Sequence, residues 1–243
     1  MNRKNTVKIT FGFILMFLPY WICKFLTGKY FGENTAIDVF VPYFILYCLG
    51  APLLLISCRS IADFDFKSIS RKPRPTDILI IFILQSSSGY FILAIASALF
   101  SMFGYKAVSG SFTSLPSYIA SLVIAPVGEE FVFRWFLYGK LRNSGYRIAL
   151  FYTSFLFAVA HLVSQGVPQA VYVFWLSLIW CCCREKYDSF LSNVLLHIGS
   201  NVWFGIIPLL LSGSKTLQFI YVIVNCMLLA VVVINHQIEG GRQ

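Results

Sequence analysis

The sequence predicts an all-α polytopic membrane protein with about eight transmembrane helices and an intramembrane polar cavity. Of its 243 residues, 58% are hydrophobic and only 12% are charged, whereas soluble domains average roughly 45–50% apolar and about 25% charged residues. The mean hydropathy is +0.76, and apolar runs of about 20 residues, long enough to cross a hydrocarbon core, recur along the chain. This composition excludes a soluble enzyme, a disordered chain and a disulfide scaffold.

Eight apolar segments follow one another, each bounded by charged residues, proline, glycine or polar clusters. The first has a basic start and no small-residue cleavage site, so we expect an uncleaved span; the fifth and sixth are short. All should be helical, because an isolated segment in lipid must satisfy its own backbone hydrogen bonds. We expect one integral membrane domain over residues 1–243, with spans at 7–27, 37–58, 77–103, 116–138, 148–165, 167–183, 189–211 and 217–236.

Basic residues set the expected orientation. When the flanks of the eight segments are assigned alternately to two sides, fourteen of the 19 Lys and Arg residues fall on one side, and Arg134 lies inside a span. Loops rich in Lys and Arg stay in the cytoplasm, so both termini and the long 59–77 loop are predicted to be cytoplasmic. The net charge of +9 is thereby explained by topology, and no nucleic-acid partner is expected. The other side holds only Lys24, Lys29, Lys106 and Lys215.

Five ionisable residues lie well inside spans, where each costs at least about 2.5–3.5 kcal/mol if it is unpaired. They are Glu129, Glu130, Arg134, His161 and His197. At about 1.5 Å per residue, both histidines and the first glutamate lie roughly 17–21 Å from the cytoplasmic basic residues. Because they share one depth on three spans, we expect them to face one another in a common site.

Helical spacing separates the roles of these groups. Glu130 and Arg134 are four residues apart and can pair on one helix face, as can His197 and Asn201. A free carboxylate beside an imidazole can take a proton from water, and an imidazole with an amide can donate to an oxyanion. The pattern indicates hydrolysis of an amide bond within the membrane.

Other protease chemistries lack their residues. The chain has no Asp pair within a span, no GxSxG and no HExxH, which disfavours aspartyl, serine and zincin mechanisms. A His₂Glu set of Glu129, His161 and His197 could still bind zinc or another divalent metal. A metal-free glutamate mechanism with no cofactor is the preferred expectation.

Three motifs carry a family resemblance. Residues 129–134 fit EExxxR, residues 157–161 fit FxxxH and residues 197–201 fit HxxxN, in this order and on separate spans. The chain therefore resembles the CPBP (Abi) family of intramembrane proteases, which includes type II CAAX prenyl endopeptidases and bacteriocin-processing or self-immunity proteins. The motifs cover 129–201, and the N-terminal half contributes hydropathy alone.

The resemblance implies a fold of eight helices with a cavity open toward the cytosol. It implies Glu129 as the water-activating base beside His161, His197 with Asn201 as oxyanion stabilisers, and Glu130 with Arg134 as structural support. The implied substrate is a peptide or membrane protein in a lipid bilayer, and the expected location is the bacterial plasma membrane. A non-catalytic bacteriocin self-immunity or scaffolding protein is the alternative, and a small transporter is a weaker one because no inverted repeat is visible.

Overall fold

The structure is a computed structural model that describes residues 3–66, 71–105 and 114–240. Within this part, every regular element is helical, and six stretches are long and apolar enough to cross a membrane. These six are Lys4–Phe31, Ala36–Cys58, Pro75–Ser101, Tyr146–Tyr187, Phe190–Leu211 and Lys215–Val232. The predicted all-α polytopic membrane fold is confirmed. Three basic residues counted for orientation, Lys67, Lys106 and Arg242, lie outside the described residues, as does the side chain of Arg3.

The helices follow the predicted segments closely. Their bounds are α1 Arg3–Phe31, α2 Ala36–Phe44, α3 Ala51–Cys58, α4 Pro75–Ser101, α5 Leu115–Ile119, α6 Ala125–Glu129, α7 Tyr138–Arg142, α8 Tyr146–Tyr187, α9 Phe190–Asn201, α10 Ile207–Leu211 and α11 Lys215–Gly240. Four π-helical segments join consecutive short helices: η1 Ile45–Gly50, η3 Ala120–Ile124, η4 Glu130–Leu137 and η5 Val202–Ile206. Consequently α5 to α7 form one uninterrupted helical run, as do α2 to α3 and α9 to α10.

Proline explains where three of the wide turns occur. Pro52, Pro126 and Pro208 each lie near the start of the α-helix that follows η1, η3 and η5. A proline inside a helical run has no backbone N–H to donate, and its ring collides with the preceding turn. The helix accommodates the missing bond by widening locally, and such π-bulges are frequent at functional sites.

The fifth and sixth predicted spans form a hairpin within α8. Gly166 breaks the helix with φ 79° and ψ 176°, a conformation that glycine adopts readily. The two arms lie side by side, because the hydroxyl of Tyr146 lies 3.3 Å from Sγ of Cys182 and the rings of Phe157 and Trp180 are 6.0 Å apart. The two arms of α8 and the α5–α7 run correspond to three predicted segments, and the other five correspond to α1, α2–α3, α4, α9–α10 and α11. That each of the eight crosses a bilayer remains a prediction.

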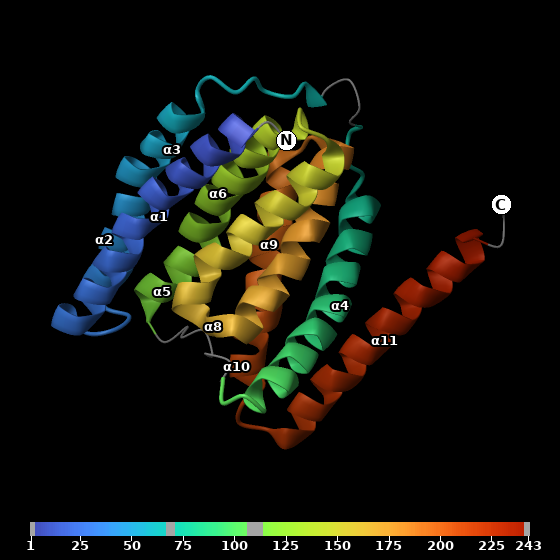
Figure 1. Ribbon diagram of the computed structural model, residues 1–243. Helices are drawn as coiled ribbons and strands as arrows, with labels where there is room; N and C mark the ends of the chain where they lie inside the picture. Colours follow the sequence, from blue (N-terminus) through green and yellow to red (C-terminus); the bar gives the residue numbers. More distant parts are fainter. Residues whose placement is uncertain (1–2, 67–70, 106–113, 241–243) are drawn as a thin grey trace.

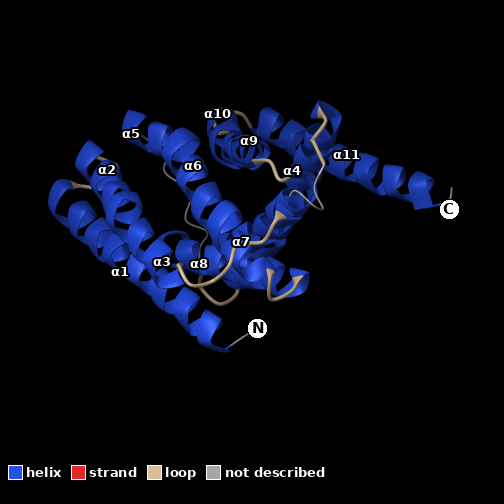
Figure 2. Cartoon of the chain, turned by 90° about the horizontal axis from the view of Figure 1, so that it is seen from above, coloured by secondary structure: helices blue, strands red, loops and turns tan. Residues whose placement is uncertain are grey.

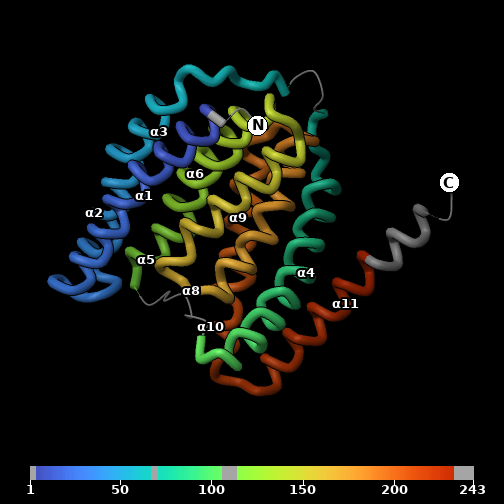
Figure 3. Tube along the Cα trace, in the orientation of Figure 1, coloured from blue at the N-terminus to red at the C-terminus, as the bar shows by residue number. Residues whose placement is uncertain are grey.

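The bundle has two flanks around a central region (Figure 1). Seen from above, α1, α2 and α3 lie on one side of α6, and α4, α9 and α11 lie on the other (Figure 2). The tube trace shows α11 leaning away from the bundle toward its C-terminal end (Figure 3). Large apolar side chains are exposed on the outside, such as Phe25 at 69% and Leu210 at 74%, which a bilayer would cover.

Aromatic packing connects the first flank to the centre. The ring of Phe133 in η4 lies 5.9 Å from that of Phe17 in α1 and 4.9 Å from that of Phe157 in α8. All three side chains are at most 4% exposed. This contact fixes η4, which follows the first glutamate of EExxxR, between α1 and α8.

The end of the bundle with the basic residues is held by ion pairs and main-chain contacts. Nζ of Lys140 donates to the carbonyl of Ile61 at 2.7 Å, which fastens the start of the 59–77 loop to α7. Arg142 pairs with Glu185 at 2.8 Å, joining α7 to the second arm of α8. The N-terminus and the α3–α4 connection lie at this same end (Figure 1).

Candidate active site

A cavity of about 400 Å³ lies among α1, α2, η3, α6, α8 and α9. Four of the predicted site residues line it: Glu129, His161, His197 and Asn201. They come from three separate segments between residues 129 and 201, namely α6, the first arm of α8, and α9. The structure therefore brings together the acid, both imidazoles and the amide that the motifs single out.

The carboxylate of Glu129 lies between the two imidazoles. Its Oε2 is 3.7 Å from Nε2 of His161 and 3.7 Å from Nε2 of His197. Both distances exceed that of a direct hydrogen bond, and this oxygen is buried without a hydrogen-bond partner among the described residues. The side chain of Glu129 is 14% exposed and that of His161 is 13% exposed, and both line the cavity.

The backbone fixes which nitrogen of His161 faces the carboxylate. Nδ1 lies 2.8 Å from the carbonyl oxygen of Phe157, one turn earlier on α8. A carbonyl oxygen only accepts, so Nδ1 carries the hydrogen, and in the neutral ring Nε2 carries the lone pair. His161 therefore presents a proton acceptor to the cavity beside Glu129. This assignment of the tautomer follows from the hydrogen-bond network.

The second imidazole is oriented by the second glutamate. Nδ1 of His197 lies 2.9 Å from Oε1 of Glu130, and the same oxygen accepts from Nη1 of Arg134 at 3.1 Å. Glu130 is 0% exposed and Arg134 is 1% exposed, so the ion pair predicted from their spacing exists and is fully buried. Since Glu130 is ion-paired and acts as an acceptor, Nδ1 of His197 is the donor, and Nε2 carries the lone pair toward Glu129.

Aromatic rings enclose this buried ion pair. The guanidinium of Arg134 lies 4.1 Å from the ring centroid of Phe157 and 4.8 Å from that of Trp180, as expected for cation–π contacts. Trp180 also stacks on His197, with centroids 4.4 Å apart and planes at 27°. Its Nε1 donates to Oε1 of Gln85 at 2.7 Å. Phe157 and Trp180 thus hold both the arginine and the second histidine in place.

Asn193 is a site residue that the motifs do not include. Its Nδ2 lies 3.0 Å from the carbonyl of Trp180 and 3.4 Å from Oε2 of Glu130, and the residue is 1% exposed. Asn193 precedes His197 by four residues, one turn along α9. Asn193, His197 and Asn201 follow one another at intervals of four residues, so the helical spacing that pairs His197 with Asn201 also identifies Asn193 as a neighbour of His197.

The amide of Asn201 is partly committed to the backbone. Its Nδ2 donates to the carbonyl of Ser121 in η3 at 2.7 Å, which ties the end of α9 to the segment before the glutamates. An amide nitrogen carries two hydrogens, so one remains for a ligand in the cavity. Asn201 can therefore hold α9 against η3 and still offer one amide hydrogen to a ligand.

The opposite wall of the cavity comes from the N-terminal half. Tyr20 of α1 and Tyr43 of α2 line it, their rings 6.0 Å apart. Tyr47 stacks on Tyr43 at 5.9 Å and lies against the backbone beside Glu129, since a Cβ added to Gly128 would be only 2.2 Å from the Tyr47 ring. No signal in the sequence identified these tyrosines, because hydropathy alone marks this half.

The donors that a divalent metal would use converge but are not arranged as a metal centre. Glu129, His161 and His197 direct one oxygen and two nitrogens toward each other. Among the described residues, however, no group of three His, Cys, Asp or Glu side chains is placed to hold a metal ion.

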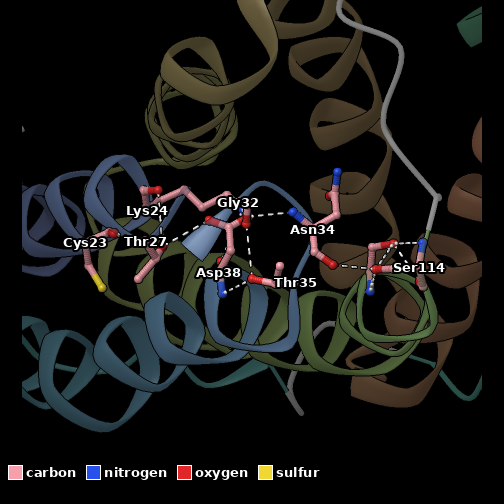
Figure 4. Close-up of polar contacts among 9 residues, drawn as sticks. Cys23, Lys24, Thr27, Gly32, Asn34, Thr35, Asp38 and Ser114 are labelled. Carbon is pink, nitrogen blue, oxygen red and sulfur yellow. Dashed lines mark hydrogen bonds and ion pairs between the residues drawn. The ribbon is translucent and has the colours of Figure 1, made fainter. Parts of the chain in front are cut away.

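The cavity extends from these groups toward the end of the bundle that is poor in basic residues. Its lining there includes Lys24 of α1 and Asn34 of the α1–α2 connection, both labelled in Figure 4, together with Ser117 of α5 and Gln165 beside the turn of α8. Two expectations from the sequence therefore disagree: cytoplasmic termini, from the basic residues, and a cavity open to the cytosol, from the family resemblance. The described lining residues extend the cavity toward the end of the bundle opposite the N-terminus.

Comparison with known proteins gives one match. Residues 111–203 match the family model described as type II CAAX prenyl endopeptidase Rce1-like. No curated protein and no solved structure matches the chain. The matched range contains EExxxR, FxxxH and HxxxN, and thus all six site residues predicted from the sequence.

Proposed function

From the match of residues 111–203 to the type II CAAX prenyl endopeptidase Rce1-like model, we propose that the chain belongs to the CPBP family of intramembrane proteases and is an endopeptidase whose water is activated by Glu129 and His161. The observation that carries the proposal is the convergence of Glu129 Oε2 with Nε2 of both histidines at 3.7 Å. One solvent oxygen can hydrogen-bond to a carboxylate and an imidazole at that spacing.

The reaction assigns one role to each group. A water held by Glu129 and His161 attacks the carbonyl carbon of the peptide, and its proton passes to the carboxylate of Glu129. The carbon–nitrogen bond then breaks, and the same proton passes to the leaving nitrogen. General acid–base catalysis of this kind contributes typically 10²–10⁴-fold.

The oxyanion requires donors, and the geometry limits which are available. Asn201 retains one amide hydrogen beyond the one given to Ser121. His197 donates from Nε2 only as an imidazolium, because Nδ1 carries the hydrogen toward Glu130. Glu130, directly behind the ring, stabilises that charged form, as the buried acid does in catalytic triads.

The substrate is a peptide or a membrane-associated protein that reaches the cavity from the bilayer or its surface. The family supports protease activity in an integral membrane protein. We propose a bacterial plasma membrane as the location and residues 1–243 as a single domain. Nothing in the described structure favours the non-catalytic self-immunity or scaffolding function.

The test compares peptides released from membranes that contain the wild-type chain or Glu129→Gln. Glutamine keeps the size and a hydrogen-bonding oxygen but accepts no proton, so we expect cleavage to fall by at least about 100-fold. Glu33→Gln, an exposed acid outside the cavity lining, is the matched control. A phenotype that is unchanged in Glu129→Gln contradicts the protease and favours the scaffold.

The same assay separates the two versions of the chemistry. Metal-free hydrolysis by Glu129 and His161 should survive prolonged chelation of divalent ions. Loss of activity on chelation, with recovery on adding zinc, would overturn the metal-free mechanism while leaving the protease assignment intact.

A further inference from the structure

One buried amide of α4 bonds two neighbours of the second histidine. Gln85 is 0% exposed. Its Oε1 accepts from Nε1 of Trp180 at 2.7 Å, and its Nε2 donates to the carbonyl oxygen of Leu196 at 2.8 Å. Trp180 is the ring that stacks on His197, and Leu196 is the residue that precedes this histidine in α9. Gln85 therefore holds both the ring beside the imidazole and the backbone that carries it.

Close packing of α4 on α9 lets a short side chain reach both partners. Phe82, three residues before Gln85, lies against Gly199 of α9, where an added Cβ would be only 2.7 Å from the Phe82 ring. One turn after Gln85, a Cβ added to Gly89 would be 3.1 Å from the ring of Phe204 in η5. Small residues of this kind let membrane helices approach closely, so the amide lies fully buried between α8 and α9.

The amide of Gln85 is used at both ends. A carboxamide has one acceptor oxygen and one NH₂ donor group, and each of them has a partner on a different helix. A carbonyl oxygen has two lone pairs, so Leu196 can accept from Gln85 and also from its own helix. Gln85 precedes residues 111–203, the range that matches the family model. Support for His197 thus comes from a part of the chain that the match does not cover.

We propose that Gln85 is a positioning residue, which holds the imidazole of His197 through the ring of Trp180 and the backbone of α9. This inference rests on the proposed endopeptidase function, in which His197 donates to the oxyanion. Gln85 is not among the described residues that line the cavity. Its removal should therefore slow the chemical step and leave binding of the peptide unchanged.

The competing explanation is that Gln85 only joins helices, as amides between membrane helices commonly do. A second bond between α4 and α8 offers a matched comparison. Nε1 of Trp175 donates to Oγ of Ser88 at 2.9 Å, one turn from the bond between Trp180 and Gln85. If both bonds only join the two helices, they should be equivalent for the reaction. The ring that stacks on His197 is that of Trp180, so a positioning role makes them different.

The first experiment measures kcat and KM for a peptide whose cleavage depends on Glu129. Gln85→Met keeps the length of the side chain and removes both hydrogen bonds. We expect kcat to fall by about 10- to 100-fold, because small displacements of catalytic groups have effects of this size, and KM to stay within about twofold. Ser88→Ala should leave kcat within about twofold, although the thermal unfolding temperature in detergent should fall in both variants. Gln85→Asn, one methylene shorter, should also lower kcat and replaces the methionine variant if that one does not fold.

The second experiment tests the route through the indole. Trp180→Phe keeps an aromatic ring but removes the N–H from which Gln85 accepts. In that background, we expect Gln85→Met to lower kcat by less than about threefold, since residues that act through a shared contact are not additive. If the two substitutions instead multiply in their effects on kcat, Gln85 acts independently of this ring and the proposed route is wrong.

Each remaining outcome contradicts a specific claim. An unchanged kcat in a folded Gln85→Met or Gln85→Asn variant refutes the positioning role and leaves the proposed function intact. Equal falls of kcat in Gln85→Met and Ser88→Ala show that the bond only joins helices. A rise in KM with kcat unchanged assigns Gln85 to peptide binding instead. If the wild-type chain shows no cleavage that depends on Glu129, the proposed function is refuted, and the positioning role falls with it.

Discussion

Nδ1 of His197 lies 2.9 Å from Oε1 of Glu130, although the two residues are 67 positions apart in the chain. The spacing of EExxxR predicted that Glu130 pairs with Arg134. In the structure, one carboxylate oxygen of Glu130 accepts from both that guanidinium and the imidazole of His197. The second glutamate therefore belongs to the site through the histidine that it orients.

Removing this carboxylate should destabilise the protein strongly. Glu130→Ala leaves the guanidinium of Arg134, which is 1% exposed, without its partner, and losing one partner of a buried pair costs about 3–5 kcal/mol. We expect a large fall in the thermal unfolding temperature in detergent. The double variant Glu130→Ala with Arg134→Met should regain much of the stability and remain inactive, because His197 is no longer oriented. An active double variant would contradict this role.

Asn193 should affect the rate of peptide cleavage by keeping the imidazole of His197 in position. It bonds Glu130 and the carbonyl of Trp180, the two groups that orient and stack on the imidazole. We expect Asn193→Ala to lower kcat by about tenfold with KM little changed, in line with residues behind a functional histidine. Asn225→Ala is the control, since that buried amide contacts Trp203 and Tyr221 away from the base. Equal losses of kcat in both variants would show a general effect on the fold.

Gly128→Ala should displace Glu129 through packing. The added methyl would be 2.2 Å from the ring of Tyr47, so the ring or the backbone beside Glu129 must move, and overpacking of this kind costs about 1–3 kcal/mol. The thermal unfolding temperature and the cleavage rate should both fall. Replacing Tyr47 by Ala in the same chain should restore part of each, and the absence of any rescue would exclude this contact as the cause.

The direction in which the cavity opens can be measured by labelling. We expect Ser164→Cys, which is exposed and lines the cavity, to react with a membrane-impermeant maleimide added outside intact cells. Asn143→Cys, exposed at the basic end, should react only after the membrane is opened. The exposed native cysteines Cys48, Cys182 and Cys226 must first be replaced. The reverse labelling pattern would mean that the basic residues misassign the orientation.

The sequence predicted the segments well because the bilayer constrains them strongly. Apolar length and flanking charge located both arms of α8, including the turn at Gly166 that a glycine and the nearby Pro168 permit. The depth of the ionisable residues also predicted which of them meet. These properties depend on local composition and on helix rise alone, and a single sequence contains both.

Contacts between distant helices were harder to predict. The bond from Glu130 to His197 and the stacking of Trp180 on that ring depend on how α9 rotates against η4 and α8. The π-helical turns shift that rotation, and hydrophobic periodicity does not register them. The cavity wall of Tyr20 and Tyr43 was missed for a different reason, because aromatic residues in a span also suit lipid-facing positions.

Two unequal parts of the chain therefore enclose the reactive groups. The range that matches the protease family supplies the acid, the imidazoles and the amide, while α1 and α2, which precede that range, supply Tyr20, Lys24 and Tyr43 on the facing wall. A chimera that kept residues 111–203 and took its first two spans from another chain would keep the proposed catalytic groups but would replace the wall that faces them.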